Sequence, residues 1–260
     1  MSLETETKIN RLIRSWPAGV VYLSSWLVDN GISSQLLNRY KKSNWLSSIG
    51  TGAVIRSGDD IDYHGGIYAL QNQAGLSVHV GGRTALSLQG RAHYIDMATG
   101  KVSLFGGKKE NLPPWFLRRD WGTSIDYYTT SFLPADMGLV EFQRKSFSVK
   151  VSSPARAILE CLYLAPKHQE LLECYELMEG LNNLRPDSVQ ELLENCSSIK
   201  VKRLFLYLAD KLEHPWLDFV DLSKVNLGSG KRSLVKDGVY IDKYQITVPK
   251  EFEKNETFRL

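Results

Sequence analysis

The spacing of apolar residues changes several times along the first sixty positions, and each spacing predicts a different element. Residues 4–16 carry apolar side chains three or four positions apart, which predicts an amphipathic helix. Residues 20–22 form a short apolar run of extended type. Residues 45–49 and 53–56 have the composition of strands, and the sequence Gly50-Thr51-Gly52 between them suits a tight turn. A β-hairpin therefore closes this segment.

Two short helices are expected between the extended run and the hairpin. Serine side chains accept hydrogen bonds from free N–H groups at helix starts, and glycine adopts the left-handed backbone that often follows a helix. The expected features are a cap at Ser24 or Ser25, an end near Asn30, a turn at Gly31, a cap at Ser33 and an end near Ser43. Three helices followed by a hairpin are the order of a winged helix-turn-helix domain.

The second of these two helices has two chemically different sides. Residues three and four positions apart share one face of a helix, so the apolar and the polar positions separate. The apolar side, with Trp26 and Ile32 before it, is expected to hold the two helices together. The apolar set on the helix is Leu36, Leu37 and Tyr40, and the polar set is Gln35, Asn38, Arg39 and Lys42.

Amides and cations on one exposed helical face suit the major groove of DNA. Gln and Asn side chains can bond adenine edges, and Arg can bond guanine edges or phosphates. The net charge of the chain, +3, is too small to indicate a nucleic-acid partner by itself, but no acidic residue occurs from Gly31 to Gly58. The candidate DNA contacts are Ser34, Gln35, Asn38, Arg39, Lys41 and Lys42 on the helix, with Thr51 and Arg56 on the wing.

The remaining sequence alternates strand and helix patterns and becomes mostly helical after Ser153. The fold class is therefore α+β: an N-terminal winged helix-turn-helix at residues 1–75, then a mixed α/β domain with a helical bundle at residues 76–260. Helices are expected at 63–73, 83–89, 154–164, 167–181, 186–196 and 199–212. Strands are expected at 76–80, 91–95, 101–105, 124–130, 139–151 and 239–248.

Two further basic segments have structural explanations as well as functional ones. The sequence Gly228-Ser229-Gly230-Lys231-Arg232 lacks the glycine spacing and the hydroxyl residue of a P-loop, because Val225 and Arg232 stand at those positions. We interpret it as a basic turn before a strand, with Lys231 and Arg232 as contacts for phosphate or a partner. A second basic area contains Lys108, Lys109, Arg118 and Arg119 and is either solvated surface or a nucleic-acid contact. The aromatic residues around it, Trp115, Phe116 and Trp121, are expected in the core.

The titratable residues show no motif for a metal or a cofactor, and we expect neither. The three cysteines, Cys161, Cys174 and Cys196, form no CxxC pair and are expected to be buried thiols. No pair of histidines has metal-ligand spacing, and His79 and His93 are expected to be structural. The pair Arg156 and Glu160 has the spacing of a salt bridge on a helix face. No apolar run is long enough for a membrane span, and the polar start of the chain is unlike a signal peptide, so a cytoplasmic protein is expected.

The motifs together resemble one protein family, the AbiEi-type antitoxins of bacterial type IV toxin–antitoxin, or abortive-infection, systems. The resemblance rests on the winged helix at Leu23 to Arg56, the glycine-bracketed helix at 79–90, and three C-terminal segments at 152–160, 227–232 and 244–249. It implies a non-enzymatic antitoxin that represses its own operon. The winged helix would bind promoter inverted repeats in double-stranded DNA, as a monomer in solution or as a dimer on DNA.

The resemblance also implies a nucleotidyltransferase-like toxin as the functional partner. Members of the family are described as acting without a stable toxin complex, so direct binding of the toxin stays an open alternative. A second interpretation is a winged helix fused to a degenerate or unrecognised metal-dependent nuclease-like domain, with Asp136, Glu141 and Lys145 as its residues. A third makes the winged helix a protein-docking module, for which no salt-dependent DNA binding is expected.

Overall fold

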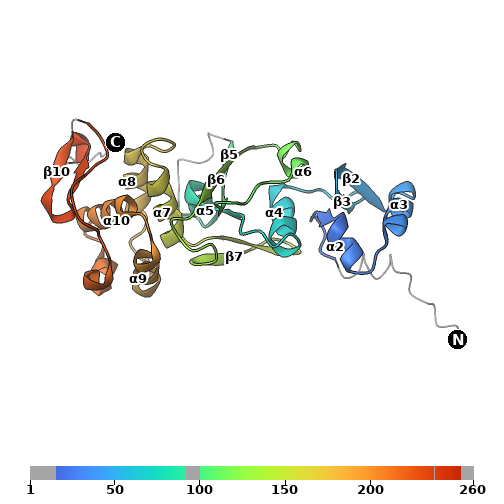
Figure 1. The fold of residues 1–260 in the computed structure, drawn as a ribbon, viewed down its shortest axis with the longest axis horizontal. Coiled ribbons are helices and arrows are strands. Elements are labelled where there is room, and N and C mark those ends of the chain that lie inside the picture. Colours follow the sequence, from blue (N-terminus) through green and yellow to red (C-terminus); the bar gives the residue numbers. More distant parts are fainter. Residues whose placement is uncertain (1–15, 92–99, 237, 253–260) are drawn as a thin grey trace. The chain divides into compact units, whose positions relative to one another are not determined.

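The computed structural model describes residues 16–91, 100–236 and 238–252 of the 260-residue chain (Figure 1). The chain forms two compact units. The first unit takes its described residues from 1–80, 100–129 and 140–151, and the second from 81–99, 130–139 and 152–260. Residues 4–15 of the helix expected at 4–16, His93 and most of the strand expected at 91–95 lie outside the described residues. The division into domains at residues 1–75 and 76–260 stays a prediction.

A helix-turn-helix opens the first unit, and Gly31 makes its turn. Helix α2 (Ser24–Asp29) ends where Gly31 adopts a φ of +87°. The N–H of Gly31 donates to the carbonyl of Val28 at 3.0 Å, and the N–H of Ile32 donates to the carbonyl of Leu27 at 2.9 Å. These two bonds form a Schellman motif, which satisfies the last carbonyls of the helix. The buried side chains of Leu27 and Ile32 belong to one core cluster, so the turn also fixes the direction of the next helix.

Helix α3 (Ser34–Lys42) begins at the predicted cap. The hydroxyl of Ser33 accepts a hydrogen bond from the N–H of Leu36 at 3.3 Å, and the helix ends before Ser43. The predicted start of α2 is wrong, however. Leu23 occupies the cap position without a side-chain hydrogen bond, because Ser24 is already helical and Leu23 is held in strand β1 (Tyr22–Leu23).

The predicted hairpin is present as strands β2 (Leu46–Gly50) and β3 (Ala53–Arg56). Together with β1 they form a three-stranded sheet in the order β1-β3-β2, which completes a winged helix-turn-helix. A core cluster lies between this sheet and the two helices. Its buried members are Val20, Tyr22, Leu27, Ile32, Leu37, Tyr40, Leu46 and Val54, with Trp26 and Leu36 partly buried against them.

Helix α4 (Tyr63–Asn72) connects the winged helix to a second sheet of the first unit. The carboxylate of Asp62 caps it by accepting from the N–H groups of His64 and Gly65. Its last side chains make the connections: the Gln73 amide bonds the backbone of Val21 and Leu23, and the Gln71 amide bonds Val78 and Lys150. The five-stranded sheet has the order β6-β5-β4-β8-β7. Its strands are β4 (His79–Val80), β5 (Lys101–Gly107), β6 (Ser124–Thr130), β7 (Leu139–Gln143) and β8 (Ser148–Ser152), and the short helix α6 is Pro114–Leu117.

The second unit is a helical bundle around α7 (Pro154–Leu164), and a small sheet belongs to the same unit. Helix α7 contacts four neighbours and buries side chains all round its surface, as expected of a central helix. Those neighbours are α5 (Gly82–Leu88), α8 (Leu171–Glu179), α9 (Pro186–Asn195) and α10 (Ile199–Lys211). The small sheet has the order β10-β11-β9, with β9 at Arg232–Ser233, β10 at Val239–Ile241 and β11 at Ile246–Val248.

Several further predictions for strands and helices differ from the structure. The strand expected at 76–80 is confined to His79–Val80. The region 139–151 is a hairpin of β7 and β8, because residues 144–147 turn. The helix expected at 167–181 begins only at Leu171, because residues 166–169 form a turn and a bend. The strand expected at 239–248 is two strands, because the 3₁₀ helix η3 (Asp242–Tyr244) and the left-handed backbone of Gln245 reverse the chain between them.

The ion pair of Arg156 and Glu160 is structural, as predicted, but it is buried and not on an exposed helix face. The two side chains are 3% and 0% exposed, and Arg156 Nε donates to Glu160 Oε1 at 2.8 Å. The other oxygen of Glu160 accepts from the N–H of Gly82 at 2.8 Å and from the hydroxyl of Ser152 at 2.7 Å. Glu160 therefore binds three parts of the second unit together.

Candidate nucleic-acid interface

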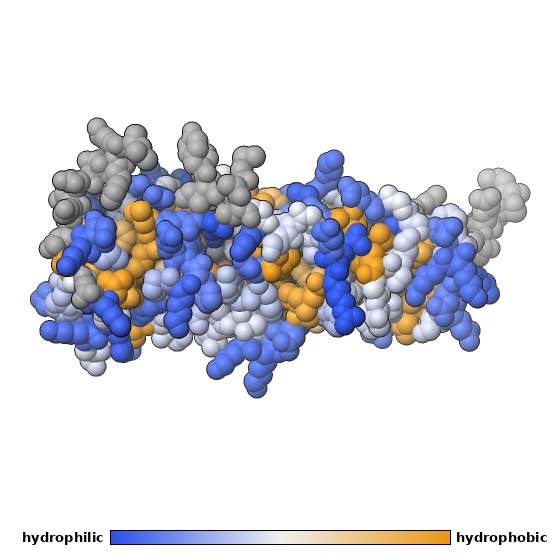
Figure 2. All heavy atoms as spheres, turned by 90° about the horizontal axis from the view of Figure 1, so that it is seen from above, coloured by the Kyte–Doolittle hydropathy of each residue, from blue (hydrophilic) through white to orange (hydrophobic). Residues whose placement is uncertain are grey.

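Helix α3 presents the predicted polar face to solvent. The side chains of Leu37 and Tyr40 are buried and that of Leu36 is half-buried, so the opposite side of the helix is free. Figure 2 shows hydrophilic side chains gathered over the end of the first unit that carries α3. The exposed residues on the helix are Ser34, Gln35, Asn38, Arg39 and Lys42, whereas Lys41 is half-buried.

The charges on α3 have a structural effect as well as a functional one. Arg39, Lys41 and Lys42 occupy the last turn, where cations interact favourably with the negative end of the helix dipole. That effect explains cations at this end of the helix, but it does not explain the amides of Gln35 and Asn38 on the same exposed face. The combination of amides, a guanidinium and ammonium groups on one face matches base-edge and phosphate contacts.

The wing is short and held in place by its neighbours. Gly50 must be glycine, because its φ is +151° and a Cβ there would lie 2.7 Å from the Cβ of Trp115 on α6. The carbonyl of Gly52 accepts from the N–H of Ser24 at 2.8 Å. Thr51, at the tip of this turn, is exposed, and its neighbours in the sequence are glycines and not lysine or arginine. The wing is therefore a short turn beside α6 and not a long basic ribbon.

Arg56 lies at the opposite end of β3 from the wing tip. Its Nε is 3.5 Å from a carboxylate oxygen of Asp59, and its Nη1 donates to the carbonyl of Trp16 at 3.4 Å. Any phosphate contact by Arg56 has to compete with these two partners, of which Asp59 lies three positions away in the sequence and Trp16 is distant. The structure brings the α3 residues together on one face, whereas it places Thr51 and Arg56 at opposite ends of the hairpin.

One exposed residue beside this interface was missed by sequence reasoning. Trp45 follows α3 directly and is 48% exposed, although tryptophan usually packs inside. Its neighbour Asn44 has a φ of +56°, which turns the chain sharply from the helix into β2. The strand pattern had assigned Trp45 to the hairpin, and only the helix boundary shows that it stands outside the core.

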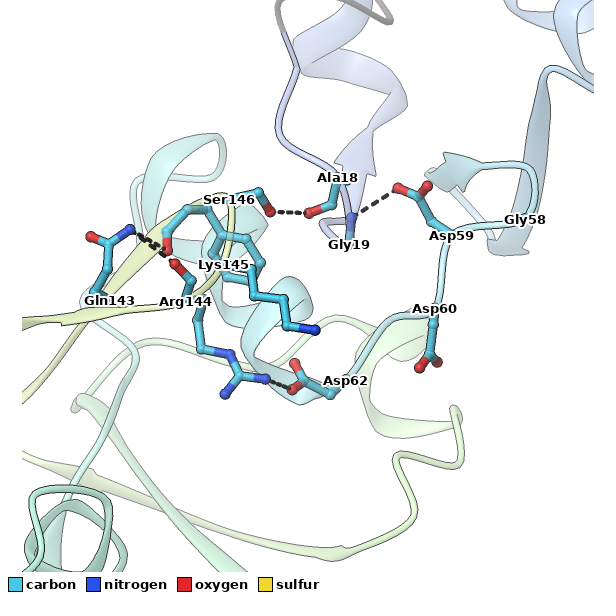
Figure 3. Close-up of a pocket in the computed structure, with 11 residues that line it drawn as sticks. Ala18, Gly19, Gly58, Asp59, Asp60, Asp62, Gln143, Arg144, Lys145 and Ser146 are labelled. Atoms are coloured by element: carbon cyan, nitrogen blue, oxygen red, sulfur yellow. Dashed lines mark hydrogen bonds and ion pairs between the residues drawn. The ribbon is translucent and has the colours of Figure 1, made fainter.

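A cavity of about 640 Å³ lies at the base of the winged helix, where the chain enters and leaves it (Figure 3). The turn between β7 and β8 reaches into this base. Arg144 Nη2 lies 2.6 Å from a carboxylate oxygen of Asp62, and the hydroxyl of Ser146 donates to the carbonyl of Ala18 at 2.6 Å. On the other side, the N–H of Gly19 donates to the carboxylate of Asp59 at 2.8 Å. These contacts join the winged helix to the five-stranded sheet within the first unit.

Asp62 is held in its ionised form at this base. Burial raises the pKa of its carboxyl. The hydrogen bond and charge of His64, the charge of Arg144 and the N–H of Gly65 together lower this pKa by more than burial raises it. The net pKa is about 2, against an ordinary value of 3.8. The ionised Asp62 thus serves both as the cap of α4 and as the anchor of Arg144.

The second basic area is partly exposed and has an aromatic core beneath it. Trp115, Phe116 and Trp121 are buried, as predicted. Lys108, Lys109 and Arg118 are exposed, and the guanidinium of Arg119 lies 5.3 Å from the ring centroid of Trp121. Helix α6 packs against strand β2 of the wing. Arg118 directly follows this helix.

The basic turn of the second unit is organised by a buried arginine that the sequence did not single out. Arg203 of α10 is 2% exposed and donates to the carbonyls of Leu227, Gly228, Gly230 and Gln245. The turn precedes β9, as predicted. Lys231 and Arg232 are both exposed, and the ammonium of Lys231 lies 4.7 Å from the ring centroid of Tyr240. They belong to the second unit, whereas α3 belongs to the first.

Other chemistry is limited in the part of the chain that the structure describes. Within it, no group of three or more His, Cys, Asp and Glu side chains is placed to hold a metal ion. Asp136 belongs to the second unit, and Glu141 and Lys145 belong to the first. Cys161, Cys174 and Cys196 are buried free thiols, and burial raises the pKa of each. Over the described ranges, no helix is long and apolar enough to cross a membrane.

Two family models match the chain, one after the other. The model described as "Transcriptional regulator, AbiEi antitoxin N-terminal domain" matches residues 5–97. The model described as "Transcriptional regulator, AbiEi antitoxin, Type IV TA system" matches residues 99–249. The chain belongs to the AbiEi antitoxin family. The members of this family are described as transcriptional regulators of type IV toxin–antitoxin systems, in agreement with the predicted resemblance.

Comparison with solved structures supports the fold of this AbiEi chain. The RV2827C protein from Mycobacterium tuberculosis has a similar crystal structure, with a TM-score of 0.55 and 13% sequence identity. The match covers 92% of this chain and 88% of that chain. At this identity the similarity concerns the fold alone. Comparison with curated proteins gives no match.

Proposed function

We propose that this AbiEi protein represses its own operon and acts as the antitoxin to a nucleotidyltransferase-like toxin. The winged helix would bind inverted repeats in the promoter. The observation that carries this proposal is the exposed face of α3, where amides and cations stand together without any carboxylate in residues 31–58. The family description as a transcriptional regulator and antitoxin supports the same function.

The proposed contacts follow from the position of each side chain on α3. Gln35, Asn38 and Arg39 contact base edges in the major groove, and Ser34 bonds a phosphate or base edge near the helix start. Lys41 and Lys42 neutralise phosphates. Thr51 touches the backbone beside the wing, and Arg56 contributes only where it exchanges Asp59 for a phosphate.

Two copies of the protein are expected on one operator. A single recognition helix contacts only a few base pairs, whereas an inverted repeat offers the same half-site twice, related by a two-fold axis. The protein would therefore be a monomer in solution or a dimer on DNA. Lys108, Lys109 and Arg118 would add phosphate contacts outside the half-site, because α6 packs against the wing.

A mobility-shift titration of the purified chain on its own upstream DNA tests the proposal. The expected result is a sequence-specific shift that weakens steeply between two salt concentrations, since released counterions make phosphate contacts salt-dependent. Competition by scrambled DNA measures specificity. Equal affinity for operator and scrambled DNA would contradict base contacts by α3, and the absence of any shift at low salt would contradict DNA binding.

Metal-dependent cleavage tests the second interpretation, the nuclease-like domain. Cleavage of DNA or RNA that is lost in both Asp136→Ala and Glu141→Ala would favour that interpretation over the antitoxin. The proposed antitoxin function predicts no such activity.

A further inference from the structure

Trp45 occupies a fixed position in the turn that leads from α3 into the wing. The N–H of Trp45 donates to the carbonyl of Tyr40 at 2.9 Å, and the N–H of Asn44 donates to the carbonyl of Lys41 at 3.2 Å. Together with the positive φ of Asn44, these two bonds form a Schellman motif at the end of α3. On the other side, the N–H of Ser57 donates to the carbonyl of Trp45 at 3.1 Å. The backbone that carries the indole ring is therefore held from both sides.

This turn explains an apolar residue at position 45, but it does not explain an exposed tryptophan. A Schellman motif often packs the side chain at this position against its own helix, and a smaller apolar residue would serve as well. Trp45 is instead 48% exposed. Its indole N–H has no hydrogen-bond acceptor among the described residues, whereas the buried Trp121 and Trp216 donate to carbonyls at 2.9 and 2.8 Å. Trp45 therefore offers an apolar ring and a donor to a partner.

The charges near Trp45 along the chain are positive. Two lysines in the last turn of α3 precede it, and Arg56 lies opposite the next residue of β2. No carboxylate occurs in residues 31–58, and the first that follows, Asp59, is already engaged by Arg56 and by a backbone N–H. An indole N–H can only donate a hydrogen bond, and the complement of a cationic surface is an anion. An anionic oxygen is therefore the acceptor that fits this position.

The sugar–phosphate backbone of DNA combines both properties that Trp45 requires. Its phosphate oxygens are anionic acceptors, and the deoxyribose between two phosphates presents C–H groups to an apolar ring. Base edges lie deeper in the groove, where the amides of α3 are proposed to bind. Trp45 follows Lys41 and Lys42, for which phosphate contacts are proposed, so it extends the end of α3 that faces the DNA backbone.

We propose that Trp45 is a backbone contact of the DNA interface, with its indole N–H on a phosphate oxygen and its ring against the adjoining deoxyribose. This contact rests on the proposed DNA-binding function and adds a neutral residue to the cations of the interface. Because the backbone at Trp45 is already fixed, ordering the side chain costs little entropy. Contacts to phosphate and sugar carry no sequence information, so Trp45 contributes to affinity and not to the choice of bases.

The test compares Trp45→Ala, which removes the ring and its N–H, with Trp45→Phe, which keeps an aromatic ring. Phe219→Ala is the matched control, because Phe219 is also an exposed aromatic residue, 76% exposed, but belongs to the second unit. Each full-length protein is titrated by fluorescence anisotropy with labelled operator and scrambled duplexes at two salt concentrations. Circular dichroism shows whether each variant is folded, and sedimentation without DNA measures self-association.

Trp45→Ala should bind operator and scrambled DNA about tenfold more weakly, by the same factor for both, because a hydrogen bond to a charged group is lost. Trp45→Phe should lie between Trp45→Ala and the unchanged chain. The slope of log affinity against log salt should stay the same, since a neutral donor releases no counterions. Phe219→Ala should bind both duplexes as the unchanged chain does.

Tryptophan emission reports the contact itself, independently of affinity. The chain contains six tryptophans, so the difference between the unchanged chain and Trp45→Phe isolates the emission of Trp45. Saturating DNA should change the emission of the unchanged chain, because the exposed ring loses water. Most of that change should be absent in Trp45→Phe, which also keeps the test decisive where Trp45→Ala fails to fold.

Each contrary result has a separate meaning. Unchanged affinity in the folded variants, or an equal change of emission in Trp45→Phe, would overturn the assignment and leave DNA binding by α3 standing. A loss confined to the operator would overturn the backbone contact in favour of a base contact. The absence of DNA binding by the unchanged chain would overturn both the assignment and the proposed function. Self-association that disappears in Trp45→Ala would overturn DNA as the occupant in favour of a second copy.

Discussion

At the scale of single residues, the DNA contacts that we propose for the exposed face of α3 are of two kinds, which should respond differently to mutation. In this proposal Arg39 and the amides contact base edges, so their loss would remove hydrogen bonds that depend on sequence. Lys41 and Lys42 would act as point charges toward phosphates, which are the same in every sequence. Each kind of contact therefore makes a separate prediction.

Replacing Arg39 by alanine should reduce both affinity and specificity. The expected loss for the operator is about 1–3 kcal/mol, with a smaller loss for unrelated DNA, because the bidentate contact to a base edge disappears. Fluorescence anisotropy with operator and scrambled duplexes measures both values. An operator affinity equal to that of the unchanged chain would remove Arg39 from the interface.

Replacing Lys42 by alanine should weaken binding to all DNA to a similar extent. The slope of log affinity against log salt should become shallower by about 1, because one phosphate contact is lost. Lys236→Ala, on the second unit, serves as the control for removal of one positive charge. A loss confined to the operator would instead place Lys42 at a base edge.

Single residues also show where sequence reasoning succeeds and where it stops. The burial of Leu37 and Tyr40 and the exposure of Gln35 follow from helical periodicity, which the sequence contains. The role of Arg203 does not, because its partners are backbone carbonyls that only the folded chain brings near. The same holds for the bond of Arg56 to the carbonyl of Trp16. The exposure of Phe219 does not follow from the sequence either, since composition cannot distinguish an outward-pointing ring from a buried one.

At the scale of elements, helix α7 and the base of the winged helix each depend on one carboxylate. Glu160 joins α7 to the start of α5 and to Ser152, and Asp62 joins α4 to the turn between β7 and β8. Local spacing in the sequence predicted the α7 ion pair and the helix that follows Asp62. It could not predict that the ion pair is buried or that Asp62 binds Arg144, because both facts depend on distant segments.

Replacing Glu160 by glutamine should strongly destabilise the chain. Arg156 would keep its buried charge without a counter-charge, and breaking such a pair typically costs about 3–5 kcal/mol. The control is Asp210→Asn, which breaks an exposed pair with Lys243 and should cost less than about 1 kcal/mol. Urea unfolding compares the two. Similar unfolding midpoints would show that the buried pair contributes no more than the exposed one.

The ionised state of Asp62 should make stability depend on acid pH. Because the pKa of Asp62 falls from 3.8 to about 2 on folding, its contribution is present above about pH 4 and is lost as the pH falls toward 2. Asp62→Asn removes this contribution, so its melting temperature should fall less between pH 5 and pH 3 than that of the unchanged chain. Asp60→Asn, in the same cavity, is the control. An unchanged pH dependence in Asp62→Asn would contradict this account.

At the scale of the whole molecule, the two units carry surfaces of different chemistry. The first unit holds the amide and cation face of α3, and the second exposes the ring of Phe219 and the carboxylates of Asp218 and Asp221. The α+β class, the winged helix and the helical bundle were predictable, because periodicity and turn residues are local signals. The composition of the two units was not, because three separated segments of the chain contribute to each.

The measurement that tests the central claim most directly is a mobility shift on the upstream DNA of this chain, at two salt concentrations, with the double variant Gln35→Ala/Arg39→Ala beside the unchanged protein. The account predicts a specific, salt-sensitive shift for the unchanged chain and only weak, non-specific binding for the variant. Circular dichroism shows whether the variant is folded. A variant that is folded and still binds the operator as tightly and as specifically as the unchanged chain would contradict recognition by α3.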